Sequence, residues 1–377
     1  MMWSVPLSIW YGILVGLLLS GVGLLLLLSN NIIMIRFYAS AARAAKVCNR
    51  PLASISISSA HLPSSTITMS TFSTSFQPPP NNSYHGTPVY SHIEIGTKKV
   101  TDAAASRNND CDAVFVVTGA SRSMGLEFVK QLLKRTKGKI VACILRPGSS
   151  PELDNALGQL SRDDRARVHV TPLDVTNEEQ IEHLAQELDI MYGRVDGLFN
   201  VAGVLGDKQT TAGPEMKLSQ LDQSWLQNQF QVNAIGPLMI TAKLAKLLKA
   251  RKGRNTYLRE TGSKESVVVN LSARVASMSD NTGGLAWYSY RMSKAALNAG
   301  VRASSHELRR QGTWAIALYP GMTDTDMSKP FQSKMMQEKG LVFPVSFTVG
   351  RLLDVVDAME EEQSGGMYDW AGQCIPF

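Results

Sequence analysis

From residue 112 to the end of the chain, hydrophobic positions form short, nearly continuous apolar runs that alternate with longer amphipathic stretches. Continuous apolar runs are typical of strands buried on both faces of a parallel sheet, and amphipathic stretches are typical of the helices that cover it. The pattern predicts strands over Val114–Val117, Ile140–Leu145, Val168–Thr171, Gly197–Asn200, Val267–Leu271 and Trp314–Tyr319, and helices over Leu126–Leu133, Glu178–Met191, Leu221–Lys249 and Ser289–Arg310. This alternation predicts an α/β fold, a single doubly wound parallel sheet with helices on both faces.

The first part of the chain has a different pattern, because Leu7 to Leu28 is free of charge and consists mainly of leucine, isoleucine, valine and aromatic residues. At about 1.5 Å per residue, a helix of this length covers the roughly 30 Å of a bilayer core. The nearest charges are basic and all follow this stretch, from Arg36 to Arg50. By the positive-inside rule, they predict a single hydrophobic membrane-spanning helix within residues 1–49, with the enzyme domain in the cytosol.

A second interpretation of this segment stays open. No acidic residue precedes Glu94, and Ser54–Ser75 is rich in serine and threonine, which is typical of a cleaved presequence for a mitochondrion or plastid. Residues 50–111 are rich in Ser, Thr, Pro and Asn and predict a disordered linker. The chain is therefore expected to comprise an N-terminal segment (1–49), a linker (50–111) and one folded domain (112–377).

Charge and metal-ligand patterns narrow the classes of function. The formal net charge is +6, but most of the surplus precedes residue 111, so the folded domain is not expected to bind nucleic acid. The four cysteines lie far apart without a Cys-x-x-Cys pair, and the six histidines show no ligand spacing. Neither a disulfide framework nor a metal site is expected.

Candidate chemistry begins behind the first strand of the domain, where small residues over Thr118–Gly125 lead directly into a helix. Small residues let the backbone approach a pyrophosphate, and the helix N-terminus presents free N–H groups and a positive dipole end. A strand before such a loop and a helix after it are the context of a dinucleotide site in a Rossmann-like fold. The predicted contacts are Gly119, Ser121, Arg122, Ser123, Met124 and Gly125.

The second strand indicates which dinucleotide binds. It ends at Leu145-Arg146-Pro147, with no acidic residue for the ribose 2′-hydroxyl of NAD, and Arg146 suits a 2′-phosphate instead. Arg122 offers a second guanidinium to the same group. The two arginines predict NADPH/NADP+ in preference to NADH/NAD+.

A tyrosine and a lysine stand four residues apart, at Tyr290 and Lys294, on the helix predicted over Ser289–Arg310. This spacing places both side chains on one helix face. An ammonium close to a phenol lowers the phenol pKa from about 10, so that the phenol can exchange a proton near neutral pH. The pair is therefore a candidate acid/base site.

The loop Thr-Gly-x-x-x-x-x-Gly and the Tyr-x-x-x-Lys pair together resemble the short-chain dehydrogenase/reductase superfamily, classical type. Ser272–Asn298 and Gly366–Gln373 are similar to its C-factor-like branch, and the resemblance extends from Ala113 to the C-terminus. This chain departs from the family at Ser123, where glycine is usual, and at Ala273, where the family usually has the second of two adjacent serines.

The resemblance implies a role for each site residue. Tyr290 would be the acid/base, Lys294 would tune it and hold the nicotinamide ribose, and Asn233 would hold a proton-relay water. Ser272 would polarise the substrate carbonyl, with Ser277 as the alternate. The further cofactor contacts that the resemblance implies are Asp174, Val175, Asn200, Ala202, Gly203, Pro320, Gly321, Thr323 and Thr325, and Met327–Lys339 would form a mobile lid.

The resemblance implies an NADPH-dependent oxidoreductase that reduces a small-molecule carbonyl, an aldehyde or ketone, to an alcohol. Two alternatives stay open. One is an NAD(P)+-dependent alcohol dehydrogenase acting on a small-molecule alcohol. The other is a nucleotide-binding signalling or scaffold protein with weak catalysis, which Ala273 favours. Members of the family commonly self-associate, so a homodimer or homotetramer is expected.

Overall fold

A computed structural model describes residues 90–95, 99–206, 214–253, 256–257 and 264–377, together with two short strands nearer the N-terminus. The chain divides into two units, Met1–Pro78 and Pro79–Phe377. In the first unit, β1 (Leu27–Leu28) pairs antiparallel with β2 (Asn31–Ile32). The other elements belong to the second unit.

The described residues correct the membrane prediction. Leu27 and Leu28, predicted as the end of a membrane-spanning helix, form β1 instead. In the part of the chain that the structure describes, no helix is both long and apolar enough to cross a membrane. The predicted hydrophobic helix, and the membrane attachment and location inferred from it, are therefore not supported. The rest of that stretch, residues 7–26, and the alternative presequence lie outside the described residues.

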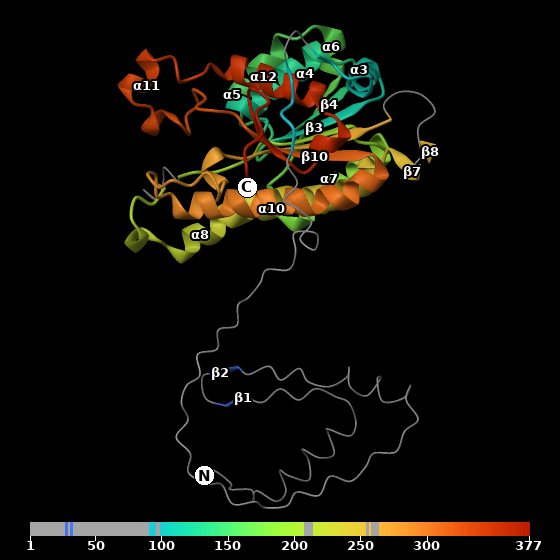
Figure 1. The fold of residues 1–377 in the computed structure, drawn as a ribbon. Coiled ribbons are helices and arrows are strands. Elements are labelled where there is room, and N and C mark those ends of the chain that lie inside the picture. Colours follow the sequence, from blue (N-terminus) through green and yellow to red (C-terminus); the bar gives the residue numbers. More distant parts are fainter. Residues whose placement is uncertain are drawn as a thin grey trace, which may run out of the picture. The chain divides into compact units, whose positions relative to one another are not determined.

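Seven parallel strands form one sheet in the order β11-β10-β9-β6-β3-β4-β5. Figure 1 shows three of its strands, β3, β4 and β10, lying between helices. The seven are β3 (Val114–Thr118), β4 (Lys139–Ile144), β5 (Val168–Pro172), β6 (Gly197–Asn200), β9 (Ser266–Leu271), β10 (Thr313–Tyr319) and β11 (Met367–Asp369). The first six coincide with the predicted strands to within one residue at each end. The edge strand β11 was not predicted, because three residues are too few to set a pattern.

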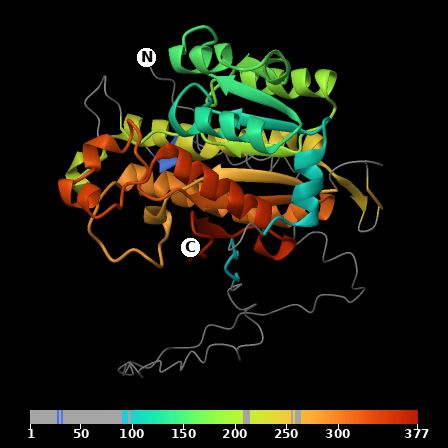
Figure 2. The same ribbon diagram turned by 90° about the horizontal axis from the view of Figure 1, so that it is seen from above.

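Helices cover both faces of this sheet. The α-helices that the structure describes in this unit are α3 (Asp102–Asn109), α4 (Ser123–Arg135), α5 (Pro151–Gly158), α6 (Arg162–Ala166), α7 (Glu178–Met191), α8 (Gln223–Phe230), α9 (Gly236–Leu248), α10 (Tyr288–Leu308), α11 (Lys334–Glu338) and α12 (Val345–Ala358). A small hairpin pairs β7 (Arg251–Gly253) with β8 (Thr256–Tyr257). Helices α4 and α12 pack on one face, onto which Figure 2 looks, and α7, α9 and α10 pack on the other.

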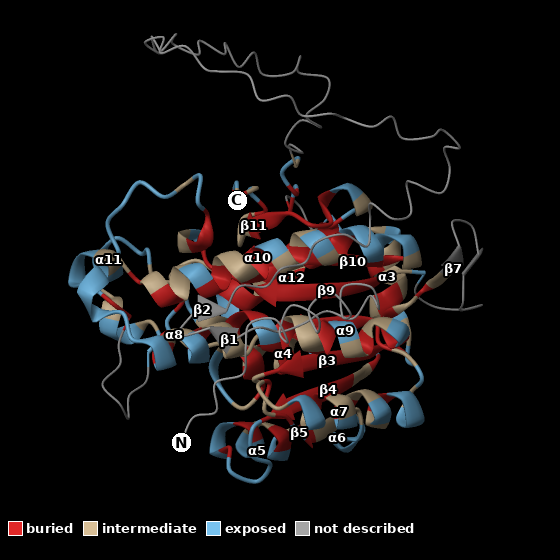
Figure 3. Ribbon diagram, turned by 90° about the horizontal axis from the view of Figure 1, so that it is seen from below, coloured by how far each residue is buried: buried red, intermediate tan, exposed pale blue. Residues whose placement is uncertain are grey.

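The strands are buried between the two helical layers, whose outer surfaces are exposed (Figure 3). Because strand side chains alternate, Phe115 and Val117 of β3 enter the core beneath α4 and α12. Val114 and Val116 enter the core beneath α7, α9 and α10. Burial on both faces explains why the strand sequences are continuously apolar.

Helix α3 corrects part of the linker prediction. Asp102–Asn109 were assigned to a disordered linker, yet they form a helix capped by the Thr101 hydroxyl, which accepts from the Ala104 N–H at 3.2 Å. Arg107, 3% exposed, pairs with Asp357 of α12 at 3.4 Å. This long-range ion pair orders a segment whose own sequence carries little hydrophobic pattern.

The long helix predicted over Leu221–Lys249 is interrupted. A π-helical turn, Gln231–Ile235, separates α8 from α9. Such turns insert an extra residue into a helix and occur often at functional sites. Asn233, a candidate site residue, lies in this turn.

Candidate active site

Two adjoining cavities lie at the carboxyl ends of the strands. The larger, about 420 Å³, is bounded by the residues that follow β3, β4, β5 and β6, and the smaller, about 200 Å³, by those that follow β6, β9 and β10. Met124, Gly203 and Thr325 are among the residues that line both. Ligands bind at this edge in open α/β sheets. Within the described residues, no cluster of three or more His, Cys, Asp or Glu is placed to hold a metal ion.

Two glycines of the β3–α4 loop admit no side chain. A Cβ on Gly119 (φ +66°) would lie 2.9 Å from the Cα of Ala202, and one on Gly125 would lie 2.1 Å from the Gly119 carbonyl oxygen. Ser123 has a φ of 52°, in the left-handed region that glycine adopts at no cost. The serine that departs from the family pattern is therefore backbone-strained.

The N-terminus of α4 is open to an anion. Its cap residue, Arg122, makes no side-chain hydrogen bond to the helix, and the first turn carries no acidic residue. Free backbone N–H groups and the helix dipole point into a cavity lined by Gly119, Ser121, Ser123 and Met124. These residues fit a dinucleotide pyrophosphate.

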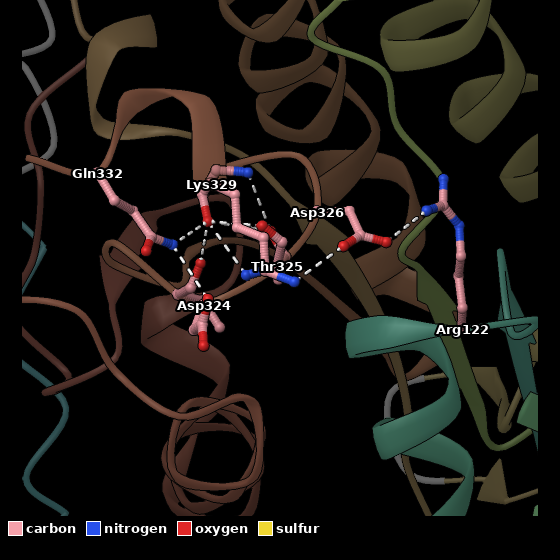
Figure 4. Close-up of polar contacts among 8 residues, drawn as sticks. Arg122, Asp324, Thr325, Asp326, Lys329 and Gln332 are labelled. Carbon is pink, nitrogen blue, oxygen red and sulfur yellow. Dashed lines mark hydrogen bonds and ion pairs between the residues drawn. The ribbon is translucent and has the colours of Figure 1, made fainter. Parts of the chain in front are cut away.

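The two arginines expected at a 2′-phosphate have different surroundings. The Arg122 Nη1 lies 3.1 Å from the Oδ2 of Asp326, and the Oδ1 of the same carboxylate lies 3.2 Å from the Nζ of Lys329 (Figure 4). Both side chains of the Arg122–Asp326 pair are about half exposed. Arg146 is exposed and follows Leu145, which lines the larger cavity. Arg122 thus lies in the cavity wall and Arg146 at its margin.

The residues that follow β5 and β6 complete the larger cavity. Asp174 and Val175 line it, as do Ala202 and Gly203. The Asp174 carboxylate is engaged locally, accepting from the N–H and hydroxyl of Thr176 at 2.9 and 2.7 Å.

Asn200 lies beneath this cavity. It is 2% exposed, and its Nδ2 donates to the Oδ1 of Asn270 on β9 at 2.9 Å. The side chain therefore links two strands, and it is absent from the lining of either cavity.

Tyr290 and Lys294 both line the smaller cavity, one turn apart on α10. The Lys294 Nζ, on a side chain that is 4% exposed, donates to the Leu271 carbonyl at 2.7 Å and lies 6.0 Å from the centre of the Tyr290 ring. Burial lowers the pKa of Lys294 to about 8. Burial also raises the pKa of Tyr290, to which the nearby Tyr319 adds. The expected lowering of the Tyr290 pKa by Lys294 is not found, because desolvation of the phenolate dominates.

Neither candidate serine is free to polarise a carbonyl. The Ser272 hydroxyl donates to the Oδ1 of Asn298 at 2.7 Å. The Ser277 hydroxyl donates to the Pro376 carbonyl, and Ser277 does not line the smaller cavity. Ala273, which does line it, has no hydroxyl.

Asn233 uses its entire amide within the protein. Its Oδ1 accepts from the Val204 N–H at 2.9 Å, and its Nδ2 donates to the Val204 carbonyl at 2.8 Å and to Gln229 Oε1 at 2.6 Å. It is fully buried. The π-helical turn is thereby joined to the loop that follows β6.

The loop after β10 borders the smaller cavity through Pro320, Gly321, Thr323 and Thr325. The Thr323 hydroxyl lies 3.2 Å from the Pro320 carbonyl and 3.0 Å from the Thr348 hydroxyl of α12. The predicted lid, Met327–Lys339, contains a short 3₁₀ turn and α11.

Four residues of the site were not singled out from the sequence: Glu215, Trp287, Tyr319 and Phe331. Trp287 (φ 42°) precedes α10, and its ring centre lies 6.2 Å from that of Tyr290 and 4.8 Å from that of Phe331 in the lid segment. Glu215, 4% exposed, accepts from the Ser289 N–H at 3.2 Å and so caps α10. The position of Tyr319 directly before Pro320-Gly321 was the one available signal, since strand ends at this edge carry site residues.

Several known proteins are similar to this chain. A family model described as short chain dehydrogenase matches residues 113–336. C-signal of Myxococcus xanthus is 34% identical over 189 residues, which cover 50% of this chain and 96% of that protein. 1-Hydroxy-2-glutathionyl-2-methyl-3-butene dehydrogenase of Rhodococcus sp. is 30% identical over 253 residues, 66% of this chain and 93% of that protein.

One solved structure is similar over nearly its whole length. The NADPH-bound carbonyl reductase from chicken fatty liver superposes with a TM-score of 0.60 at 25% identity. The match covers 71% of this chain and 99% of that one. Its fold therefore corresponds to the seven-stranded sheet and its helices.

Proposed function

This chain belongs to the short-chain dehydrogenase family of NAD(P)-dependent oxidoreductases, and from that premise we propose that it is an NADPH-dependent reductase of aldehydes or ketones. The similarity to C-signal also confirms the C-factor-like branch. The observation that carries the proposal is that Tyr290 and Lys294 line a small cavity that adjoins an open helix N-terminus. The catalytic domain in this proposal is residues 112–377.

The larger cavity would hold the cofactor, and bound NADPH would supply the hydride. Gly119, Gly125 and the first turn of α4 would bind the pyrophosphate through backbone N–H groups. The remaining contacts would come from Ser121, Ser123, Met124, Asp174, Val175, Ala202, Gly203, Pro320, Gly321, Thr323 and Thr325, with Asn200 supporting them from below.

Charge supports NADPH over NADH. Arg122 and Arg146 offer guanidinium groups to a 2′-phosphate, and no carboxylate ends β4 to bind a 2′-hydroxyl. The structurally similar chicken reductase is described as NADPH-bound, which agrees with this choice.

The protonation state of the phenol suits the reductive direction. Because burial raises the pKa of Tyr290, the side chain is neutral at pH 7 and holds the proton that a forming alkoxide needs. Lys294, with a pKa lowered to about 8, remains mostly protonated at pH 7 and can donate to the ribose hydroxyls. Oxidation of an alcohol would instead require the phenolate, which burial disfavours.

Asn233 would assist proton supply indirectly. Its amide is already bonded to Val204 and Gln229, so we assign it to holding the loop after β6. A relay water would then be bound by the backbone of the π-helical turn.

The smaller cavity favours an apolar substrate. Its walls include Trp287, Phe331, Leu285, Met322 and Met327, and its volume of about 200 Å³ suits a compact carbonyl compound. Aromatic and thioether side chains pack well against planar groups. We therefore propose an aryl or branched aliphatic ketone or aldehyde as substrate.

A signalling role is the second candidate, supported by the similarity to C-signal. It predicts cofactor binding without turnover. The experiment that separates the two is titration of the full-length protein with NADPH and NADH, followed by turnover on a carbonyl panel. Tyr290→Phe should lower kcat by about 10²-fold or more and leave the Kd for NADPH unchanged. Undiminished turnover in this variant would disprove the proposed mechanism.

A further inference from the structure

A second tyrosine, Tyr319 at the end of β10, lines the smaller cavity together with Tyr290, and its side chain ends in a hydroxyl. We propose that this hydroxyl, of Tyr319, is the second hydrogen-bond donor to the substrate carbonyl. The proposal rests on the carbonyl reductase function argued above. The end of β9 provides no free hydroxyl for this role. The proposal therefore assigns the role to a tyrosine on the neighbouring strand, β10.

A second donor is needed because the carbonyl oxygen gains negative charge as the carbon takes the hydride. Losing one such donor costs enzymes about 10²- to 10³-fold in rate. The serine and threonine hydroxyls of the cavity wall are already engaged: Ser272 with Asn298, Thr323 with Pro320 and Thr348, and Thr325 with Ser328, whose own hydroxyl donates to the Thr323 carbonyl. The Lys294 ammonium donates one N–H to the Leu271 carbonyl, and its other N–H groups are assigned above to the ribose hydroxyls.

The sheet register places Tyr319 beside the end of β9, where Ser272 lies, and on the same side of the sheet as α10. Leu318 of β10 is aligned with Leu271 of β9, and both enter the core beneath α4 and α12. By strand alternation, the next residues, Tyr319 and Ser272, face α10, and Tyr319 packs against that core. Tyr319, at the end of β10, therefore lies on the side of the sheet that faces α10, the helix that carries Tyr290.

The Tyr319 hydroxyl is available. Within the described part of the chain it has no hydrogen-bond partner, whereas its ring is fixed against the core. Burial raises its pKa, an effect that the Arg274 charge opposes and the Asp369 charge reinforces. Tyr319 is thus a neutral phenol at pH 7, able to donate a hydrogen bond without giving up its proton.

The step is balanced with one proton donor and one hydrogen-bond donor. The carbonyl oxygen accepts hydrogen bonds from Tyr319 and Tyr290, and its carbon forms the new C–H bond with the hydride of the reduced nicotinamide. The O–H bond of Tyr290 breaks and its proton completes the alcohol. Tyr319 keeps its proton, and Tyr290 regains one from solvent.

The test compares three variants of the full-length protein with NADPH and a panel of aryl ketones and 1,2-diketones. Tyr319→Phe should lower kcat by about 10²-fold with an unchanged Kd for NADPH. Adding Ala273→Ser to that variant should restore at least part of the loss, because it returns a hydroxyl to the end of β9.

Tyr368→Phe is the matched control. Tyr368 lies on β11, is fully buried in the opposite core and carries a buried hydroxyl without a partner in the described residues. Removing that hydroxyl should leave turnover unchanged.

A second readout does not depend on turnover. Ketone binding to the protein with NADP+, followed by quenching of tryptophan fluorescence, should weaken about fivefold in Tyr319→Phe, as expected for one lost hydrogen bond. Normal kcat and normal ketone binding in Tyr319→Phe would overturn the inference. Activity that survives Tyr290→Phe, or a wild type that neither reduces nor binds ketones, would instead overturn the proposed function.

Discussion

The guanidinium of Arg122, in the loop before α4, lies 3.1 Å from the carboxylate of Asp326, in the loop after β10 (Figure 4). Both residues line the larger cavity. The pair connects the loop proposed to bind phosphate with the segment that leads into the predicted lid. A cofactor 2′-phosphate would have to compete with Asp326 for the same guanidinium.

Asp326→Asn should therefore strengthen NADPH binding. Removing the carboxylate frees Arg122 and removes a negative charge near the phosphate, and an exposed pair of this kind is worth about 0.2–1 kcal/mol. We expect a two- to fivefold lower Kd for NADPH by fluorescence titration, with a smaller change for NADH. Asp324→Asn is the control, since Asp324 bonds Gln332 at 3.2 Å instead. Equal gains for both cofactors would contradict the competition.

Arg146→Ala should weaken NADPH binding about tenfold while leaving NADH nearly unaffected, because a charge-assisted hydrogen bond to the 2′-phosphate is lost. The measurement is the ratio of the two Kd values at fixed ionic strength. Lys139→Ala, at the opposite end of β4, controls for the loss of one positive charge. A parallel loss for both cofactors would remove the argument for a 2′-phosphate site.

Gly125→Ala should abolish cofactor binding. Its Cβ would lie 2.1 Å from the Gly119 carbonyl oxygen, so the loop or the start of α4 must move. Gly158→Ala is the matched control, since a Cβ there has no neighbour within 4 Å. Isothermal titration should show an unchanged Kd for the control and no measurable binding for Gly125→Ala; retained binding would show that the loop tolerates the shift.

Much of the fold could be predicted, because strands buried on both faces are continuously apolar. The proposed catalytic pair and the proposed phosphate loop can be recognised in the sequence because their spacing is local: one helix turn for Tyr290 and Lys294, one strand–helix junction for Gly119–Gly125. The charge of Arg122 made it a candidate phosphate-binding residue in the sequence. Its partner Asp326 could not be predicted, because it lies on a loop distant in sequence and no local pattern joins the two residues.

The features that escaped prediction depend on contacts between distant segments. Helix α3 is ordered by the ion pair of Arg107 with Asp357 on α12, which its own composition does not indicate. The hydroxyls of Ser272 and Ser277 looked available in sequence and are used by Asn298 and Pro376. Tyr319 reaches the site only through the register of β10 against β9.

Lys294 leads to a prediction about stability and pH. Burial lowers its pKa from 10.5 to about 8 in the folded protein, so the unfolded chain binds more protons between these two values. Stability therefore rises with pH across that window, and below pH 8 the folded state carries the full cost of the buried charge, up to about 3 kcal/mol.

Lys294→Met removes this titration. The free energy of unfolding of wild type relative to Lys294→Met, from urea denaturation without cofactor, should be constant from pH 6 to 7 and increase from pH 8 to 10. Lys246→Met is the control, because the Lys246 side chain is 81% exposed. It should show no comparable pH-dependent difference from wild type. If the unfolding free energy of wild type relative to Lys294→Met stays flat or falls above pH 8, the pKa of Lys294 is not lowered in the folded protein. The hydrogen bond to the Leu271 carbonyl would then stabilise the buried charge.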